Sequence, residues 1–339
     1  MTNAAATDIN QIQLQLFQII KNKLPADASI ADEVGKLLNI SSDSAYRRMR
    51  GEKQITFEEL YLLANSYKIS LDQLMGINTG GVLFQGNIVN EKTYGFDQYL
   101  TNMLHTMAYF NSFKSKELYY SSKDLPIFHH FVIREIAAFK WFFWLKSYLQ
   151  FPSFAKKKFK FSDYPDELFK LDQQVLGMYN QIDSREIWNI ESMTIFFRQV
   201  EFYREGDVFE SDEDALKLYE ALEKMWDHLE KQAALGYKFR IDDPEQKPLG
   251  EYQMYYNEVL LGDNSILAVT DNLKMAFMTH TTFNFMMTRD VAFTENMYNF
   301  MQTQMKRSTL ISKVSEKERS RFFRIIRERI QKRKEALEV

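Results

Sequence analysis

Basic side chains are concentrated at positions 46–53, which hold three arginines and one lysine against one carboxylate. A guanidinium can donate two hydrogen bonds to guanine in the DNA major groove, and both basic side chains can bind phosphate. Ala45 and Met49 have the spacing of the inner face of a short helix that ends at Gly51. The outward face of this helix is predicted to carry Ser42, Asp43, Tyr46, Arg47 and Arg50.

These outward side chains differ in the chemistry they offer to DNA. Arg47 is predicted to bond to guanine. Asp43 either accepts a hydrogen bond from a cytosine amino group or is only a favourable first-turn helix residue. Tyr46 could pack on a thymine methyl group or reach a phosphate. The groups predicted to bind phosphate are Arg50, Lys53 and the helix start at Thr56.

Short helices with clear start and stop signals must position this surface. A first helix ends at Pro25, and a second begins after Ser29, a predicted N-cap. A turn at 39–41 leads into the basic helix, and Thr56 with Glu59 predicts a capping box for a fourth helix. With a fifth helix following, the first 76 residues are predicted to form one small all-α domain.

The positions that join these helices carry a resemblance to a known family. Gly35 allows two helices to cross closely, and Ile40 and Ala45 hold the second helix against the first. With the 39–41 turn, Gly51 and the apolar pattern at 57–74, these residues resemble the DNA-binding domain of the Xre/Cro–repressor family of helix-turn-helix proteins.

The resemblance implies a lambda-repressor-like fold of five helices. It also implies that the helix carrying Arg47 and the start of the next helix contact double-stranded DNA. One position departs from the family pattern, because Arg48 stands where an apolar residue is normal. Either Met49 takes the buried place, or the helix is rotated.

Composition limits the classes of function. The chain has no cysteine, so we expect no disulfide and no thiolate chemistry, which fits a reducing compartment. The formal net charge is -3, so a nucleic acid would have to bind to a local basic patch. Charged residues interrupt the most lipophilic stretch, 127–151, which is predicted to be a buried helix. With no secretory signal at the N-terminus, we expect a cytoplasmic protein without a membrane partner.

The chain is predicted to contain two domains. A helix-turn-helix DNA-binding domain spans 1–76, a linker spans 77–81, and a helical effector and dimerisation domain spans 82–339. Helical periodicity recurs in the large domain at 96–113, 125–150, 164–182, 185–204, 212–236, 290–307 and 315–336.

Three segments of the large domain have the shorter period of strands. Residues 252–256, 266–269 and 274–279 are separated by tight-turn sequences. The fold class is therefore predicted to be mainly α, with a small antiparallel β insertion in the helical C-terminal domain.

Enzymatic motifs are not found. The adjacent His129 and His130 would diverge on a helix, so they cannot both bind one metal without distortion. The sequence has no glycine-rich phosphate loop, nucleophile elbow or His-Glu-x-x-His pattern. We expect no metal, no cofactor and no catalytic activity.

Two features of the large domain could serve a partner. Residues 94–161 contain 20 aromatic side chains in 68 positions, which form either a core or a pocket for a small-molecule or peptide effector. The basic last helix, 315–336, could contact DNA or a membrane surface, but docking on the acidic body or dimer packing is favoured.

These observations predict a sequence-specific DNA-binding transcription regulator. Residues 1–76 carry 8 basic against 9 acidic side chains, so one copy offers little electrostatic attraction for DNA. We therefore expect a homodimer on an inverted-repeat operator. Two alternatives stay open: a protein–protein interaction module whose helix-turn-helix does not bind DNA, and a helical bundle whose arginines are merely solvated.

Overall fold

The chain divides into two compact units, Met1–Gly81 and Val82–Val339, each with its own hydrophobic core. The computed structural model describes residues 9–24, 28–76, 81–259, 263–281 and 283–337. Apart from Gly81, the predicted linker at 77–81 lies outside the described residues.

The first unit is a bundle of short helices. Leu16 and Ile20 of the first helix pack with Val34, Ala45 and Leu63 of the next three, and all five side chains are fully buried. Ser29 and the Thr56–Glu59 capping box start two of the helices as their sequences predict. The helices are α1 (Ile9–Lys23), α2 (Ile30–Leu38), α3 (Ser42–Met49), α4 (Phe57–Ser66) and α5 (Leu71–Met75).

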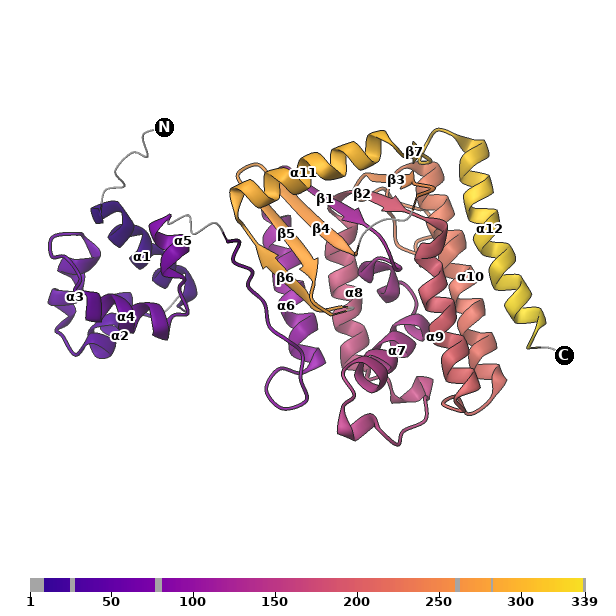
Figure 1. Ribbon diagram of the computed structural model, residues 1–339, viewed down its shortest axis with the longest axis horizontal. Coiled ribbons are helices and arrows are strands. Elements are labelled where there is room, and N and C mark those ends of the chain that lie inside the picture. The colour runs from indigo at the N-terminus through magenta and orange to yellow at the C-terminus, as the bar shows by residue number, and fades with distance from the viewer. Residues whose placement is uncertain (1–8, 25–27, 77–80, 260–262, 282, 338–339) are drawn as a thin grey trace. The chain divides into compact units, whose positions relative to one another are not determined.

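A seven-stranded mixed sheet forms the centre of the second unit (Figure 1). Its strand order is β6-β5-β4-β1-β2-β3-β7. The central strands β1, β2 and β3 run parallel, and the remaining pairs are antiparallel. The strands are β1 (Lys116–Ser121), β2 (Asp183–Trp188), β3 (Tyr252–Tyr256), β4 (Ser265–Thr270), β5 (Lys274–Thr279), β6 (Phe285–Thr288) and β7 (Thr309–Leu310).

Helices cover both faces of this sheet (Figure 1). Leu118 and Tyr120 point from β1 into the large core, while Tyr119 between them points to the opposite face. There it shares a smaller core with Met297 and Met301 of α11 (Val291–Lys306). The helices that contribute to the large core include α6 (Phe96–Asn111), α7 (Arg134–Phe143), α8 (Asp166–Asn180), α9 (Thr194–Glu205), α10 (Asp212–Leu235) and α12 (Glu316–Glu335).

The prediction of a small antiparallel β insertion is wrong. The three expected strands are present as β3, β4 and β5, but they belong to the seven-stranded mixed sheet. In this sheet β1 and β2 lie between β3 and β4. The second unit is therefore built around a mixed sheet with helices on both faces.

Four strands, β1, β2, β6 and β7, are not among those expected from the sequence, and the two central ones, β1 and β2, carry charged residues that hide their period. The prediction of one helix over 185–204 is wrong, because β2 occupies 183–188 and α9 begins only at Thr194. Arg185 and Glu186 stand in the middle of β2, and Glu186 is fully buried. A buried carboxylate is rare unless it is hydrogen-bonded, so the alternation expected of a strand was not visible.

The lipophilic stretch 127–151 is largely buried, but it is not one helix. A 3₁₀ segment, η1 (Ile127–Phe131), precedes α7, and a π turn, η2 (Trp144–Tyr148), follows it.

The basic last helix docks on the body. Phe322 and Ile326 of α12 are fully buried. Arg327 donates to Asp227 and Glu230 of α10, each at 2.7 Å. Of the alternatives open for this helix, docking on an acidic surface is the one the structure shows.

Candidate nucleic-acid interface

Local backbone features fix the turn between α2 and α3. Asn39 adopts the left-handed conformation (φ 53°), and the N–H of Ile40 donates to the carbonyl oxygen of Gly35 at 2.9 Å. A Cβ atom on Gly35 would lie 3.0 Å from the carbonyl oxygen of Ile40, so a larger residue would push the turn away from α2. Ser41 then caps α3 by accepting a hydrogen bond from the N–H of Ser44 at 3.2 Å. The chain therefore enters α3 in one defined direction.

The outward side of α3 carries most of the predicted DNA-binding side chains. Asp43 and Tyr46 are exposed, and the side chains of Arg47 and Arg50 are 54% and 61% exposed. Ser42 is also exposed, but its hydroxyl donates to Asp32 Oδ1 of α2 at 2.7 Å. Asp43, Tyr46, Arg47 and Arg50 are therefore accessible to a ligand, whereas the hydroxyl of Ser42 binds α3 to α2.

At position 48 the structure shows neither of the two predicted alternatives, a buried Met49 in place of Arg48 or a rotated helix. Arg48 is itself buried, 4% exposed, and donates from Nε and Nη2 to the two carboxylate oxygens of Glu59 at 3.0 and 2.7 Å. Its Nη1 also donates to the carbonyl oxygen of Ser44 at 3.1 Å. The hydrogen bonds from Arg48 hold the pKa of Glu59 below its usual value. Met49 packs at partial exposure against the core of the first unit, and the ion pair joins α3 to the start of α4.

The two predicted phosphate-binding positions that follow α3, Lys53 and Thr56, differ in how available their polar groups are to a ligand. Lys53 is exposed in the loop before α4. Thr56 is exposed too, but its hydroxyl accepts from the N–H of Glu59 at 3.2 Å, and its N–H donates to Glu59 Oε2 at 3.0 Å. Because both groups serve the capping box, Thr56 is less available to a phosphate than Lys53.

Gln13 is a structural residue of this surface that the sequence analysis missed. Its Nε2 donates to the carbonyl oxygens of Arg48 and Lys53 at 2.7 and 2.8 Å. Its Oε1 accepts from the N–H of Ile55 at 3.0 Å. One buried amide therefore holds the end of α3 and the loop that carries Lys53. The available signal was its position on the apolar face of α1, three residues before Leu16.

Glu52 limits the positive charge of the surface. Its carboxylate lies 3.4 Å from Arg50 Nη1 and 3.9 Å from Arg47 Nε. The three side chains are about half exposed, so these pairs are weak and can separate when a competing anion arrives.

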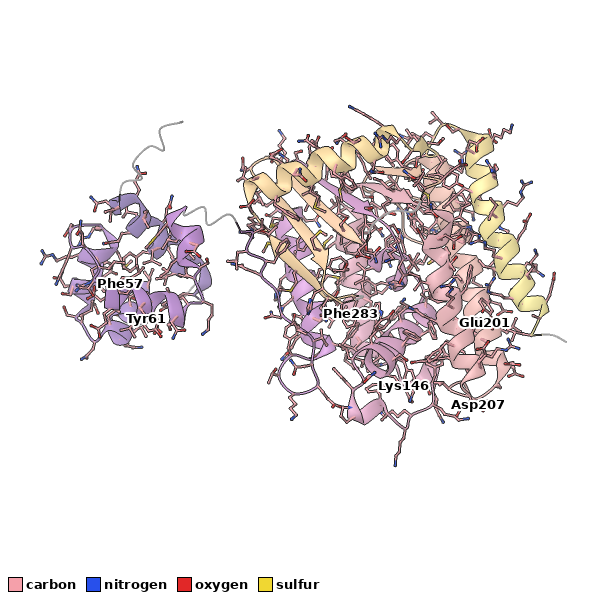
Figure 2. The ribbon with its side chains drawn as sticks, viewed as in Figure 1. Phe57, Tyr61, Lys146, Glu201, Asp207 and Phe283 are labelled. Atoms are coloured by element: carbon pink, nitrogen blue, oxygen red, sulfur yellow. The ribbon has the colours of Figure 1, made fainter. Side chains whose placement is uncertain are left out.

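An exposed aromatic pair lies on the neighbouring helix α4 (Figure 2). Phe57 is 83% exposed and Tyr61 is 60% exposed. Residues four apart share one helix face, so the pair forms a small apolar surface beside the capping box.

The second unit contains a buried charged cluster centred on Glu186, which is 0% exposed. The carboxylate accepts hydrogen bonds from the hydroxyls of Tyr179 and Tyr252 and from Trp188 Nε1, and it pairs with His129 Nε2 at 2.9 Å. Burial alone would raise the pKa of Glu186, but His129 and the other donors outweigh it and lower the pKa to about 2. With its partners complete and no solvent access, this carboxylate is placed to hold β2 within the core.

The described parts of the chain contain neither a metal-binding cluster nor a membrane-spanning helix. No cluster of three or more histidine, aspartate or glutamate side chains is positioned there to bind a metal ion. Nor does any described helix combine the length and apolarity required to cross a bilayer.

Comparisons of the chain with protein-family models, with curated proteins and with solved structures found no match.

Proposed function

We propose that this chain is a sequence-specific DNA-binding transcription regulator that acts as a homodimer in the cytoplasm. The observation that carries the proposal is the contrast on α3 between exposed Arg47 and Arg50 and buried Arg48. A merely solvated arginine face needs no fixed orientation. Here the buried ion pair to Glu59 and the Gln13 hydrogen bonds both hold α3 in place. Rigid placement of donors is what base recognition requires.

In this proposal α3 enters the major groove. Arg47 donates to guanine, Tyr46 contacts a thymine methyl group or a phosphate, and Asp43 accepts from cytosine or acts only in the first turn. Arg50 and Lys53 bind phosphate and fix the register of the protein on the duplex.

A second copy would supply the affinity that one unit lacks. Residues 1–76 carry 8 basic and 9 acidic side chains, so one copy has little general attraction for DNA. The main contact between the copies is assigned to the second unit, and Phe57 and Tyr61 offer an exposed apolar surface for an additional contact between the two first units. Two-fold symmetry then calls for an inverted-repeat operator with half-sites about 34 Å apart.

The second unit is assigned to assembly and to receiving a small-molecule or peptide signal, with no catalytic step. Its buried carboxylate Glu186 has no exposure through which a substrate could reach it. The absence of cysteine from the sequence agrees with a cytoplasmic site of action.

The second candidate function is a protein–protein interaction module that does not bind DNA. The exposure of Phe57, at 83%, favours it, because a large apolar side chain open to water often marks a protein contact. In this case α4, rather than α3, would be the functional surface.

Selection of genomic DNA fragments by the purified full chain tests the choice. The regulator is supported if the bound fragments share an inverted repeat, and if the double substitution Arg47→Ala with Arg50→Ala abolishes the enrichment. Lys317→Ala with Arg324→Ala on α12 is the matched control, because it removes two exposed positive charges from the other unit. Absence of any shared motif would reject the regulator.

Sedimentation of the same chain tests the dimer separately. We expect a dimer, and Phe57→Ser is expected to weaken it only slightly, because the main contact is assigned to the second unit. A parent chain that is monomeric both free and bound to DNA would contradict this assembly.

A further inference from the structure

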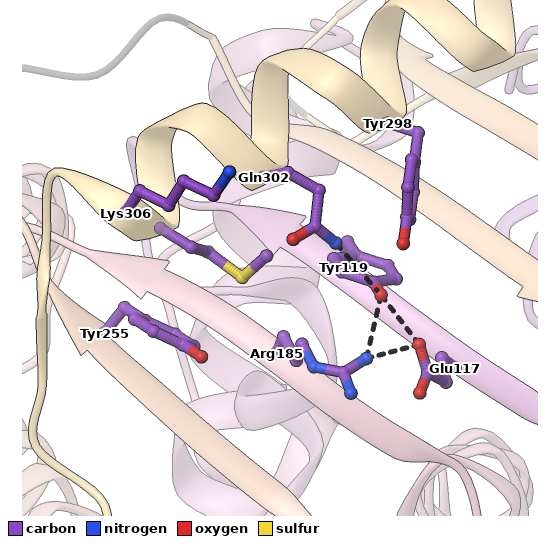
Figure 3. Close-up of a pocket in the computed structure, with 8 residues that line it drawn as sticks. Glu117, Tyr119, Arg185, Tyr255, Tyr298, Gln302 and Lys306 are labelled. Carbon is purple, nitrogen blue, oxygen red and sulfur yellow. Dashed lines mark hydrogen bonds and ion pairs between the residues drawn. The ribbon is translucent and has the colours of Figure 1, made fainter.

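A cavity opens on the face of the sheet that α11 covers (Figure 3). Helix α11 packs on this face through Met297 and Met301, against Leu267 of β4 and Ala276 of β5. Toward β1, β2 and β3 a hollow of about 450 Å³ is left between the strands and the C-terminal half of the helix. Its lining consists of Glu117, Tyr119, Arg185, Tyr255, Tyr298, Gln302, Met305 and Lys306.

Charged groups of opposite sign are fixed on the strands that floor the cavity. Arg185 Nη1 donates to Glu117 Oε2 and to the Tyr119 hydroxyl, the latter at 2.8 Å, and that hydroxyl donates to Glu117 Oε2 at 2.7 Å. Arg185 Nε is held by Gln253 Oε1 at 3.3 Å. Partial burial alone would raise the pKa of Glu117, but the bonds from Arg185 and Tyr119 lower it overall, so the carboxylate is ionised.

Part of the bonding capacity of these groups is unused. Three polar atoms make no hydrogen bond to any residue that the structure describes: Glu117 Oε1, Arg185 Nη2 and Lys306 Nζ. Glu117 therefore still offers an acceptor for a cation, and Arg185 and Lys306 still offer donors for an anion.

The rest of the lining consists of three tyrosines, Met305 and the amide of Gln302, whose Nε2 donates to the Tyr119 hydroxyl at 3.4 Å. The rings of Tyr119 and Tyr298 meet edge to face with centroids 5.5 Å apart, and Met305 is buried beside them. Tyr255 stands on the other side of the hollow, as Figure 3 shows. An apolar side chain of a ligand would find contacts on these surfaces, and cavities of this size hold small organic molecules.

We propose that this cavity binds a free amino acid as its zwitterion, with an apolar side chain. The ammonium group binds Glu117 Oε1, the carboxylate binds Arg185 Nη2 and Lys306 Nζ, and the side chain lies against the tyrosines and Met305. The amino acid would be the signal that the second unit receives in the proposed function. Only an effect of the amino acid on DNA binding rests on that function. Binding of the amino acid to the second unit stands by itself.

Calorimetric titration of the full chain, without DNA, tests the binding. The probes are the twenty common L-amino acids, followed by the N-acetyl and the carboxamide derivatives of the best binder. Each derivative removes one charge and is expected to bind at least about tenfold more weakly, as the loss of a charge-assisted hydrogen bond implies. The proposal is overturned if no amino acid binds or if either derivative binds as well as its parent.

Two substitutions locate the binding. Glu117→Gln and Lys306→Gln are each expected to weaken binding, by about tenfold for the first. Lys317→Gln, which removes one exposed positive charge from α12, is expected to leave binding unchanged. Thermal melting followed by tryptophan fluorescence shows whether each variant is folded, since all four tryptophans lie in the second unit. Unchanged affinity in both folded cavity variants would place the ligand elsewhere and overturn the assignment.

A separate titration with DNA keeps the two proposals distinguishable. If the amino acid binds and DNA does not, the cavity assignment stands and the regulator fails. If DNA binds while no amino acid does, the cavity assignment fails and the regulator stands.

Discussion

Arg48 of α3 and Glu59 of α4 form a buried, two-bonded ion pair with N–O distances of 3.0 and 2.7 Å. Glu59 also accepts from the N–H of Thr56, so one carboxylate caps α4 and holds α3 at the same time. The Arg48–Glu59 ion pair fixes the orientation of α3, and this orientation determines where the exposed Arg47 and Arg50 point. The stability of the first unit and the orientation of α3 therefore depend on the same ion pair.

Loss of one partner of this pair should destabilise the first unit. Arg48→Met leaves the mostly buried carboxylate of Glu59, 15% exposed, without its cation, at an expected cost of about 3 kcal/mol. Urea unfolding of the full chain followed by circular dichroism measures the loss. Tryptophan fluorescence serves as an internal control, because all four tryptophans lie in the second unit and should report an unchanged midpoint. Arg47→Met, at an exposed neighbouring position, should cost no more than about 0.5 kcal/mol. Equal midpoints for both variants would contradict a structural role for the pair.

The exposed arginines should differ in what they recognise. Arg47→Ala is expected to cost about 1–3 kcal/mol of binding to the selected operator and to relax one base position. Arg50→Ala should weaken binding to all sequences alike and reduce its salt dependence, because it removes a phosphate contact. Titrations on operators with single mismatches at two salt concentrations separate the two effects. Uniform losses for both variants would rule out the division of roles.

The parts of the first unit that could be predicted are those encoded within a few residues. Ser29 accepts from the N–H of Asp32, and Thr56 pairs with Glu59, so each helix start depends on a partner three residues away. The burial of Arg48 and the hydrogen bonds of Gln13 depend on partners 11 to 42 residues distant. Periodicity and capping patterns carry no information about such contacts.

The same limit explains the error in the second unit. Strand β1 pairs with β2, which follows it by more than sixty residues, and with β4, which follows it by about 150. Its Tyr119 and Tyr120 point to opposite faces and both are buried, while Lys116 and Glu117 stand side by side at its start, so the strand shows no alternation of apolar and polar residues. A strand buried on both sides cannot be told from a buried helix by periodicity alone. The pairing of β1 with β2 brings Arg185 to Glu117 and forms the cavity beside them, so neither the ion pair nor the cavity could be predicted from the sequence.

Asp172 on α8 should make the second unit less stable as pH rises. Its carboxyl is fully buried, Tyr164 donates to Oδ2, and Oδ1 has no hydrogen-bond partner among the described residues. Burial raises its pKa from 3.8 to about 8. Between these values the folded chain keeps a proton that the unfolded chain has lost, so the free energy of unfolding falls as pH rises from about 4 to about 8.

Asp172→Asn tests this dependence, because an amide cannot ionise. Urea midpoints measured by tryptophan fluorescence at pH 5 and pH 9 should differ less in the variant than in the parent chain. At pH 9 the variant should be more stable by about 2 kcal/mol. Asp97→Asn, the same change at an exposed position of α6, should leave the parent dependence intact. A parent chain whose stability is flat over this range would show that the carboxyl is ionised in the fold.

Glu52 should restrain DNA binding by the two exposed arginines. It lies 3.4 Å from Arg50 and 3.9 Å from Arg47, so a phosphate must compete with its carboxylate for both. Glu52→Gln removes the competing charge and its repulsion of DNA. We expect all sequences to be bound about 3- to 10-fold more tightly at low salt, with the gain shrinking at higher ionic strength. Asp72→Asn on α5 changes the net charge equally away from α3, and should give a smaller effect. Fluorescence anisotropy with a labelled operator at two salt concentrations measures both variants, and a loss of affinity in Glu52→Gln would mean that Glu52 positions the arginines rather than competing for them.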